Sequence, residues 1–249
     1  MKTNSHFIKQ IGFGALLLLL SVLFYTLHYA LFHDAHHIFI YLVGDVAFVF
    51  IEVLLVTLIL HQILSEREKR AMRQKLNMVI GAFFSEVGTP LLNHFRSFDK
   101  SADRIADRLD VDADWSHEQF ERMREVLRTH DYEVDSRAGD LKTLQESLIS
   151  KRPFLLRLLE NPNLLEHERF TELLWAVFHL ADELSHRPTM EGLPQPDYEH
   201  LAGDIKRAYA LLIREWLSHL DHLKASYPYL FSLAVRTNPF NPTASVELQ

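Results

Sequence analysis

Two long apolar runs near the N-terminus restrict the fold of this chain more than any other feature. The first covers about residues 7–32 and the second about residues 38–64. About 20 residues of helix cross a bilayer, so each run is long enough to span it. Only His33-Asp34-Ala35-His36-His37 separates the runs, so we expect an antiparallel hairpin of two transmembrane helices over residues 1–64. A cleaved signal peptide is the alternative for the first run, which is long for that purpose and lacks a clear small-residue cleavage site.

The composition changes sharply after this hairpin. Residues 7–64 carry almost no charge, whereas the chain from Ser65 onward is rich in Glu, Asp, Arg and Lys. Helical periodicity dominates the charged part and no strand signal stands out. We therefore predict an all-α protein with a basic juxtamembrane helix over 65–89, a cytoplasmic helical bundle domain over 90–236 and a flexible tail over 237–249.

Positively charged residues set the expected orientation of the hairpin. Lys2 and Lys9 precede the first run, five cations follow the second, and the connection between the runs has no Lys or Arg. Cytoplasmic flanks carry such an excess, so both termini are expected in the cytoplasm and the protein in the cell inner membrane. The five cations are expected to contact anionic lipid headgroups; they are Arg67, Lys69, Arg70, Arg73 and Lys75.

Polar residues lie inside both apolar runs. Asp45 and Glu52 are seven residues apart, so they share one face of the second helix. The first helix offers no obvious partner to Glu52. The expected intramembrane polar cluster consists of Ser21, Tyr25, His28, Tyr41, Asp45 and Glu52. Such groups either hold helices together or handle protons and cations, and the helix-joining interpretation is favoured.

The connection between the runs contains three histidines. His33, His36 and His37 with Asp34 could bind a metal by residue type. No fixed surrounding hydrogen bonds that would orient such ligands are visible in the sequence. A solvated interfacial loop is the favoured interpretation.

Breaks and caps divide the charged part into helices. Gly88-Thr89-Pro90 predicts a helix break, with Thr89 as the N-cap, and Ser116 is well placed as another N-cap. Proline-containing breaks also separate the two longest helices, which we expect to pack antiparallel as the core of the bundle. The predicted helices cover about 90–98, 101–109, 116–128, 138–150, 153–160, 166–186, 198–225 and 228–235.

Two histidine–carboxylate stripes suggest a metal site at first sight. Helical spacing places His179, Glu183 and His186 on the face opposite the apolar face of their helix, so a solvated face is expected there. The stripe of Glu215, His219 and His222 lies nearer its apolar face and is a weak metal candidate. No metal and no other cofactor are therefore assigned.

Several classes of chemistry receive no support from the sequence. The chain has no cysteine, which removes disulfides and thiolate chemistry. It has no phosphate-binding loop, dinucleotide fingerprint, zinc-protease motif or nucleophile elbow. The net charge of -7 argues against nucleic-acid binding. An enzyme is therefore the less favoured class.

The segment from Val43 to Leu92, above all Asn77 to Gly88, resembles a family of uncharacterised prokaryotic two-span membrane proteins with a helical cytoplasmic domain. This resemblance supports the architecture and implies no activity.

Three functions remain open from the sequence. The first is an oligomeric, membrane-anchored regulatory or interaction module, with the lipid bilayer, further copies of itself and an unknown cytoplasmic protein as partners. The second is a small channel or transporter-like element that uses Asp45 and Glu52. The third is a membrane enzyme with a helical metal site.

Overall fold

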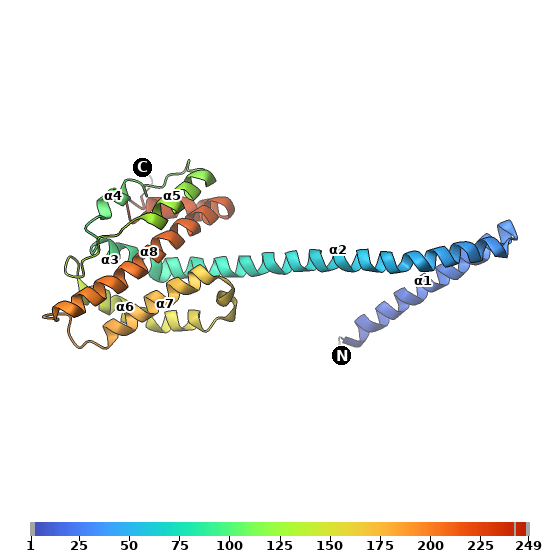
Figure 1. Cartoon of the computed structure of the whole chain (residues 1–249), viewed down its shortest axis with the longest axis horizontal. Helices are drawn as coiled ribbons and strands as arrows, with labels where there is room; N and C mark the ends of the chain where they lie inside the picture. The colour runs from blue at the N-terminus through green and yellow to red at the C-terminus, as the bar shows by residue number, and fades with distance from the viewer. Residues whose placement is uncertain (1–2, 242, 248–249) are drawn as a thin grey trace. The chain divides into compact units, whose positions relative to one another are not determined.

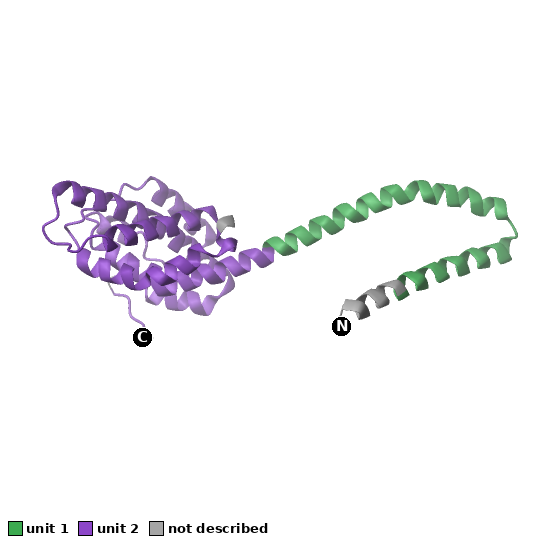
Figure 2. Cartoon of the chain, turned by 90° about the horizontal axis from the view of Figure 1, so that it is seen from below, with its two compact units in different colours: residues 1–69 green, residues 70–249 purple. Residues whose placement is uncertain are grey.

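The computed structural model describes residues 3–241 and 243–247, with side chains from residue 12 onward except at 165 and 166. Lys2 and the last two tail residues lie outside the described residues. The chain is all-α, and the described part adds to its helices only one isolated antiparallel bridge, between Asp99 and Val134. It divides into two compact units, Met1–Lys69 and Arg70–Gln249 (Figure 2).

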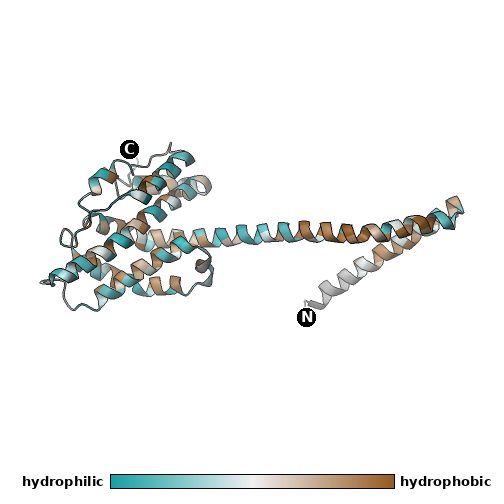
Figure 3. Ribbon diagram, viewed as in Figure 1, coloured by the Kyte–Doolittle hydropathy of each residue, from teal (hydrophilic) through white to brown (hydrophobic). Residues whose placement is uncertain are grey.

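The first unit is built from two long helices. α1 covers Thr3–Phe32, and α2 covers Ala35–Phe83, of which residues 35–69 belong to this unit. Their most apolar windows have mean hydropathies of 2.0 and 2.5, and no residue of either window is buried. By length and composition alone, both helices could cross a membrane. In Figure 1 the two helices meet at the connection and separate along their length, and Figure 3 colours most of their described residues as hydrophobic.

The connection between α1 and α2 is shorter than the five residues expected. His33 adopts a left-handed backbone conformation with φ 53°, and the Oδ1 atom of Asp34 accepts a hydrogen bond from the backbone N–H of His37 at 3.1 Å. This contact satisfies one of the free N–H groups at the start of a helix. The second helix therefore begins at Ala35.

The helix break expected at Gly88-Thr89-Pro90 is wrong. α2 passes into a π-helical turn, η1 (Phe84–Gly88), and then into α3 (Thr89–Arg96), with Gly88 and Thr89 both in the right-handed helical region. The backbone N–H of Thr89 bonds to the carbonyl of Phe84, so Thr89 continues the helix and does not cap it. A π-turn inserts one residue and shifts the hydrogen-bond ladder. A β-carbon on Gly88 would lie 2.6 Å from the Phe84 ring, so a larger residue there would force that ring to move.

The remaining helices belong to the second unit and follow the expected order. They are α4 (Ala102–Ala106), α5 (His117–Thr129), α6 (Leu141–Leu159), η2 (Pro162–Glu166, a 3-10 turn), α7 (Glu168–Ser185), α8 (Gln195–Ser226) and α9 (Pro228–Arg236). One predicted break is wrong, because Pro153 lies inside α6. Pro153 is exposed, and so is Ile149 one turn earlier, so water can satisfy the carbonyl that the missing N–H leaves free.

α8 organises the second unit. It packs against α3, α5, α7 and α9, and Figure 1 shows it between α5 and α7. α7 and α8 are antiparallel, because Arg169 lies beside Glu215 and His179 lies beside Asp204. The apolar faces of these helices enclose a core that includes Phe83, Phe95, Phe120, Phe170, Leu212 and Trp216.

The start of the tail is packed, which corrects the prediction of a flexible segment from residue 237. Phe240 is 1% exposed and its ring lies 5.3 Å from that of Trp216. Buried Asn238 donates a hydrogen bond to the carbonyl of Leu109 at 2.8 Å, and Arg96 donates one to the carbonyl of Pro239 at 2.9 Å. A short segment rich in Pro and Asn looks unstructured in sequence, but one aromatic anchor and specific hydrogen bonds hold it.

Candidate functional site

Four of the six expected polar-cluster residues surround one cavity in the first unit. Ser21, Tyr25 and His28 of α1 and Tyr41 of α2 line a cavity of about 560 Å³ close to the connection. The His28 ring stacks on the ring of His37, with centroids 5.9 Å apart and planes 7° from parallel. The structure thus brings the aromatic part of the cluster together.

The two carboxyl groups of the expected cluster are not part of this cavity. Asp45 and Glu52 are both exposed. The apolar side chains between them in the sequence are exposed as well. Within the described side chains, neither makes an ion pair or a side-chain hydrogen bond. If α2 crosses a bilayer here, both carboxyl groups need partners from outside this chain or must be protonated.

Of the three histidines expected in the connection, His33 lies in it, whereas His36 and His37 belong to the first turn of α2. His33, His36 and His37 are exposed, and the His37 ring packs edge-on against Tyr41 with centroids 4.6 Å apart. Their nitrogens do not converge with Asp34 on a common point in the part of the chain that the structure describes. The backbone hydrogen bond from His37 lowers the pKa of the Asp34 carboxyl, which keeps it charged as a helix cap.

The five cations proposed to contact lipid are all exposed along α2. Lys69 lies 3.7 Å from Glu66 on the same helix, a weak and solvated pair. The exposed side chains are those of Arg67, Lys69, Arg70, Arg73 and Lys75.

The second unit contains a groove between the end of α2, α8 and α9. It has a volume of about 700 Å³, and most of its lining side chains are apolar. Met78, Leu230 and Leu233 line it and are themselves exposed. His219 and His222 are the histidines that line it, among the residues that the structure describes.

Burial keeps the two groove histidines neutral. The ring of His219 stacks on that of Phe84, with centroids 4.9 Å apart, and burial lowers the pKa of His219 to about 4. Burial also lowers the pKa of His222, whose Nδ1 lies 3.3 Å from the Nδ2 of Asn77. The groove therefore offers an apolar wall with neutral imidazoles, which suits an uncharged or apolar group.

The weak metal candidate of the second stripe is not assembled. Glu215 is buried and lies 3.7 Å from the Nε of Arg169, while His219 and His222 turn toward the groove. Burial raises the pKa of Glu215, and the charge of Arg169 acts in the opposite direction. Glu215 therefore belongs to the α7–α8 interface, and the stripe gives no common ligand position.

The stripe of His179, Glu183 and His186 does not act as one group: two of its residues contact α8, whereas the third contacts its own helix. His179 and Glu183 meet His200 of α8, and the ligand atoms of these three residues lie within 4.8 Å of one another. His186 is exposed and its Nδ1 lies 2.8 Å from the carbonyl of Asp182 on its own helix. The sequence pattern did not indicate His200 and Asp204, at i and i+4 on α8, because their partners lie on a different helix. The matching i, i+4 spacing on both helices was the available signal.

These features define a class: an all-α protein with an N-terminal pair of long apolar helices and a C-terminal helical domain organised around one central helix. Comparison with known proteins agrees with this division. The MJ1433 N-terminal helical domain matches residues 3–64, and the C-terminal helical domain of the uncharacterized protein MJ1433 matches residues 72–236. The chain belongs to the MJ1433 family.

A full-length relative supports this assignment. The uncharacterized protein MJ1433 of Methanocaldococcus jannaschii is 47% identical to the chain over 225 residues, which is 90% of each protein. No solved structure matches the chain.

Proposed function

We propose that this protein is a self-associating, membrane-anchored interaction or regulatory module. In this proposal residues 1–64 form a two-span hairpin, and the C-terminal helical domain lies on the cytoplasmic side, where it engages another protein. The observation that carries the proposal is the complete exposure of the apolar windows of α1 and α2.

The exposed surface of α1 and α2 supports insertion into a bilayer. Soluble monomers rarely expose continuous apolar patches of more than a few hundred Å². Here every described side chain from Phe39 to Leu64 is exposed, and nearly all are apolar. The hydrocarbon core of a bilayer would cover this surface, and the helical backbone satisfies its own hydrogen bonds.

Charge supports the orientation within the proposal. The five cations after Leu64 and the lysines before the first run would all lie on the cytoplasmic side. Anionic headgroups there would attract the exposed cations by about 1 kcal/mol each.

Asp45 and Glu52 support self-association. A carboxyl group near the centre of a bilayer costs about 2.5–3.5 kcal/mol on insertion scales and normally faces protein or water. The hairpin provides no partner to either group among its described side chains, whereas the same face of a second copy would provide one.

The test uses the absence of cysteine from the chain. Val56 lies about 40° from Glu52 around the helix, and Leu54 lies about 200° away. In native membranes, oxidation of the single-cysteine variant Val56→Cys should give a disulfide-linked dimer, and the matched control Leu54→Cys should not. Equal cross-linking of the two variants, or none in either, would refute association through the Glu52 face.

The exposed carboxylates on one helical face also favour a second candidate, a small channel or transporter-like element. Proton and cation flux into proteoliposomes separates the two functions. We expect no flux, and we expect Glu52→Gln to alter oligomer size only. Flux in the wild type that Glu52→Gln abolishes without a change in oligomer size would establish the transport function instead.

A further inference from the structure

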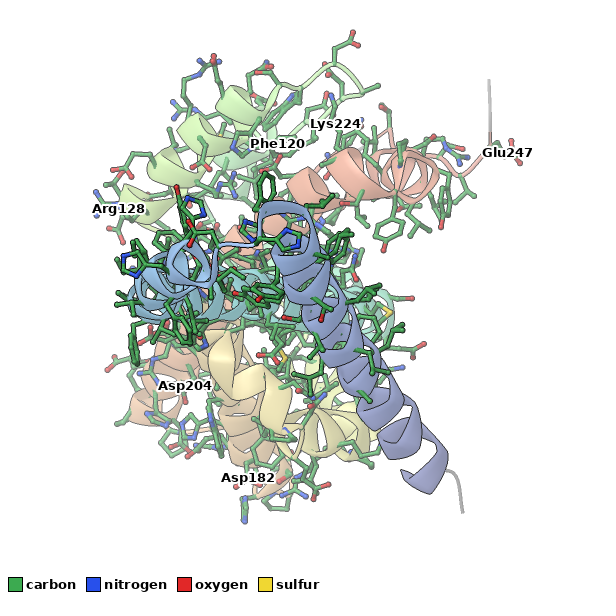
Figure 4. All side chains as sticks on the ribbon, turned by 90° about the vertical axis from the view of Figure 1, so that its right-hand side faces the viewer. Phe120, Arg128, Asp182, Asp204, Lys224 and Glu247 are labelled. Carbon is green, nitrogen blue, oxygen red and sulfur yellow. The ribbon has the colours of Figure 1, made fainter. Side chains whose placement is uncertain are left out.

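Side chains of metal-ligand type meet where α7 and α8 pack together: the ligand atoms of His179, Glu183 and His200 lie within 4.8 Å of one another, and Asp204 lies beside the two histidines. His179 and Glu183 are one turn apart on α7, and His200 and Asp204 are one turn apart on α8. Because the helices are antiparallel, the two pairs face each other across the interface. Figure 4 labels Asp204 of α8 and Asp182 of α7 in the lower left part of its view.

The centre of this cluster is a buried carboxylate with an unused oxygen. Asp204 is 4% exposed, and its Oδ2 has no hydrogen-bond partner among the residues that the structure describes. The Nε2 atoms of His179 and His200 lie 3.4 and 3.3 Å from that oxygen. Its other oxygen lies 3.4 Å from Nη1 of Arg207. A buried carboxylate is costly unless cations lie beside it, and the groups beside Asp204 are the two imidazoles and Arg207. An ion bound between the imidazoles and Asp204 would neutralise the carboxylate without requiring either imidazole to be protonated.

The distances suit a shared metal better than hydrogen bonds. Good N–H···O hydrogen bonds measure about 2.7–3.2 Å, and both imidazole contacts to Asp204 are longer. Two ligands bound to a tetrahedral Zn²⁺ at about 2.0–2.1 Å lie about 3.3–3.4 Å apart, which matches both contacts. The Nε2 of His200 also lies 3.8 Å from the Oε2 of Glu183.

Neighbouring residues orient Glu183, and the two histidines are accessible from solvent. Arg187 donates a hydrogen bond of 2.8 Å to the Oε2 of Glu183, and this contact lowers the pKa of the Glu183 carboxyl. Glu183 is therefore an oriented anion with its other oxygen free to bind. His179 is 46% exposed and His200 is 52% exposed, so an ion can enter from solvent.

We propose that His179, His200 and Asp204 bind a divalent transition-metal ion, with Zn²⁺ as the best fit, and that Glu183 completes the site. Two imidazole nitrogens and two carboxylates are an ordinary ligand set for zinc. The ion joins α7 to α8 and neutralises Asp204. This inference is independent of the membrane anchor and of self-association.

The experiment is a Zn²⁺ titration of the full-length chain in detergent after treatment with a chelator, in competition with a chromophoric chelator. We expect one equivalent to bind. His200→Gln should weaken binding by at least about 100-fold, since loss of even a supporting hydrogen bond costs 10–100-fold. His186→Gln is the matched control, because this exposed histidine follows the end of α7 and lies outside the cluster, and the variant should bind zinc like the wild type.

Two further readouts keep the outcome decisive. Co²⁺ should give the intense visible absorption of tetrahedral coordination in the wild type and in His186→Gln, but not in His200→Gln. Zinc should raise the unfolding temperature of the wild type by mass action and leave that of His200→Gln unchanged. His200 is half exposed, so its replacement should leave the metal-free fold intact, which circular dichroism checks.

Three results would overturn the proposal. They are no stoichiometric zinc in the wild type, unchanged affinity in His200→Gln, and unchanged affinity in Asp204→Asn. Retained binding in both variants would place any zinc elsewhere, for example at the histidines of the α1–α2 connection. If Asp204→Asn fails to fold, the result with His200→Gln decides.

Discussion

The two units of this protein are both helical, yet they obtain their stability in different ways. In the first unit, the described side chains of α1 and of α2 up to Lys69 are almost all exposed. In the second unit, large side chains such as Phe83, Phe95 and Phe170 are fully buried. A helix satisfies its own backbone wherever it lies, but only the second unit also covers its apolar surface. The comparison shows that the second unit covers its apolar side chains with its own core, whereas the apolar side chains of the first unit are left exposed.

A matched pair of phenylalanine deletions on α2 should show the largest difference between the units. Phe83 is 0% exposed and Phe50 is 73% exposed. Phe83→Ala should destabilise the second unit by about 3–5 kcal/mol, because it removes buried contacts and leaves a cavity. Phe50→Ala should leave the stability of that unit unchanged.

Tryptophan fluorescence during denaturant unfolding measures this effect selectively. All three tryptophans of the chain, Trp115, Trp175 and Trp216, lie in the second unit. Equal losses of stability in the two variants would show that the units unfold together, and the comparison would then fail.

The acid response of the second unit should depend on His219. Its pKa is about 4 in the folded protein, against about 6.5 in an unfolded chain, so the unfolded state takes up the proton first as pH falls. The stabilisation provided by a neutral His219 is present above pH 6.5 and is lost between about pH 6.5 and 4. The difference between the two pKa values sets an upper limit of about 3 kcal/mol on this loss. Screening by solvent reduces it, because His219 is partly exposed.

His219→Phe isolates this effect, because a phenyl ring can keep the stacking on Phe84. The wild type should lose stability relative to this variant as pH falls through that window. The pKa of Glu215 is raised and the pKa of His222 is lowered in the folded protein. Both groups are present in the wild type and in the variant, so their contributions largely cancel in the difference between the two stability–pH curves. Parallel stability–pH curves would contradict the assignment of a buried neutral imidazole.

Two glycine replacements within the second unit should act in opposite directions. In Gly88→Ala the new β-carbon would lie 2.6 Å from the Phe84 ring and 3.0 Å from the Phe83 ring, so we expect a loss of about 1–3 kcal/mol. In Gly203→Ala the β-carbon meets nothing within 4 Å on α8, so we expect a gain of up to about 1 kcal/mol from helix propensity. Unfolding midpoints compare the two. A neutral Gly88→Ala would show that the π-turn tolerates a side chain.

Local pattern was sufficient for much of this architecture. The apolar runs predicted two long helices, and the helical periodicity of the charged part predicted an all-α domain after them. The expected N-cap at Ser116 is confirmed, because its hydroxyl accepts from the Gln119 N–H while the Gln119 side chain accepts from the Ser116 N–H. These features depend on residues within one or two helical turns of each other, so a single sequence contains the whole signal.

The tertiary structure alone decided the features that depend on contacts between distant segments. His179 and Asp204 come together only because α7 and α8 pack antiparallel in one particular register. Phe240 is buried because its ring packs against that of Trp216. At Gly88 the rings of Phe83 and Phe84 occupy the space that a side chain would need, and the helix continues through this position. The sequence by itself determined most of the helical segments, since backbone hydrogen bonding and side-chain periodicity are local, but not their continuity through Gly88 and Pro153. Which helix faces meet, and therefore which polar groups share a site, was decided by the packing of side chains far apart in the chain.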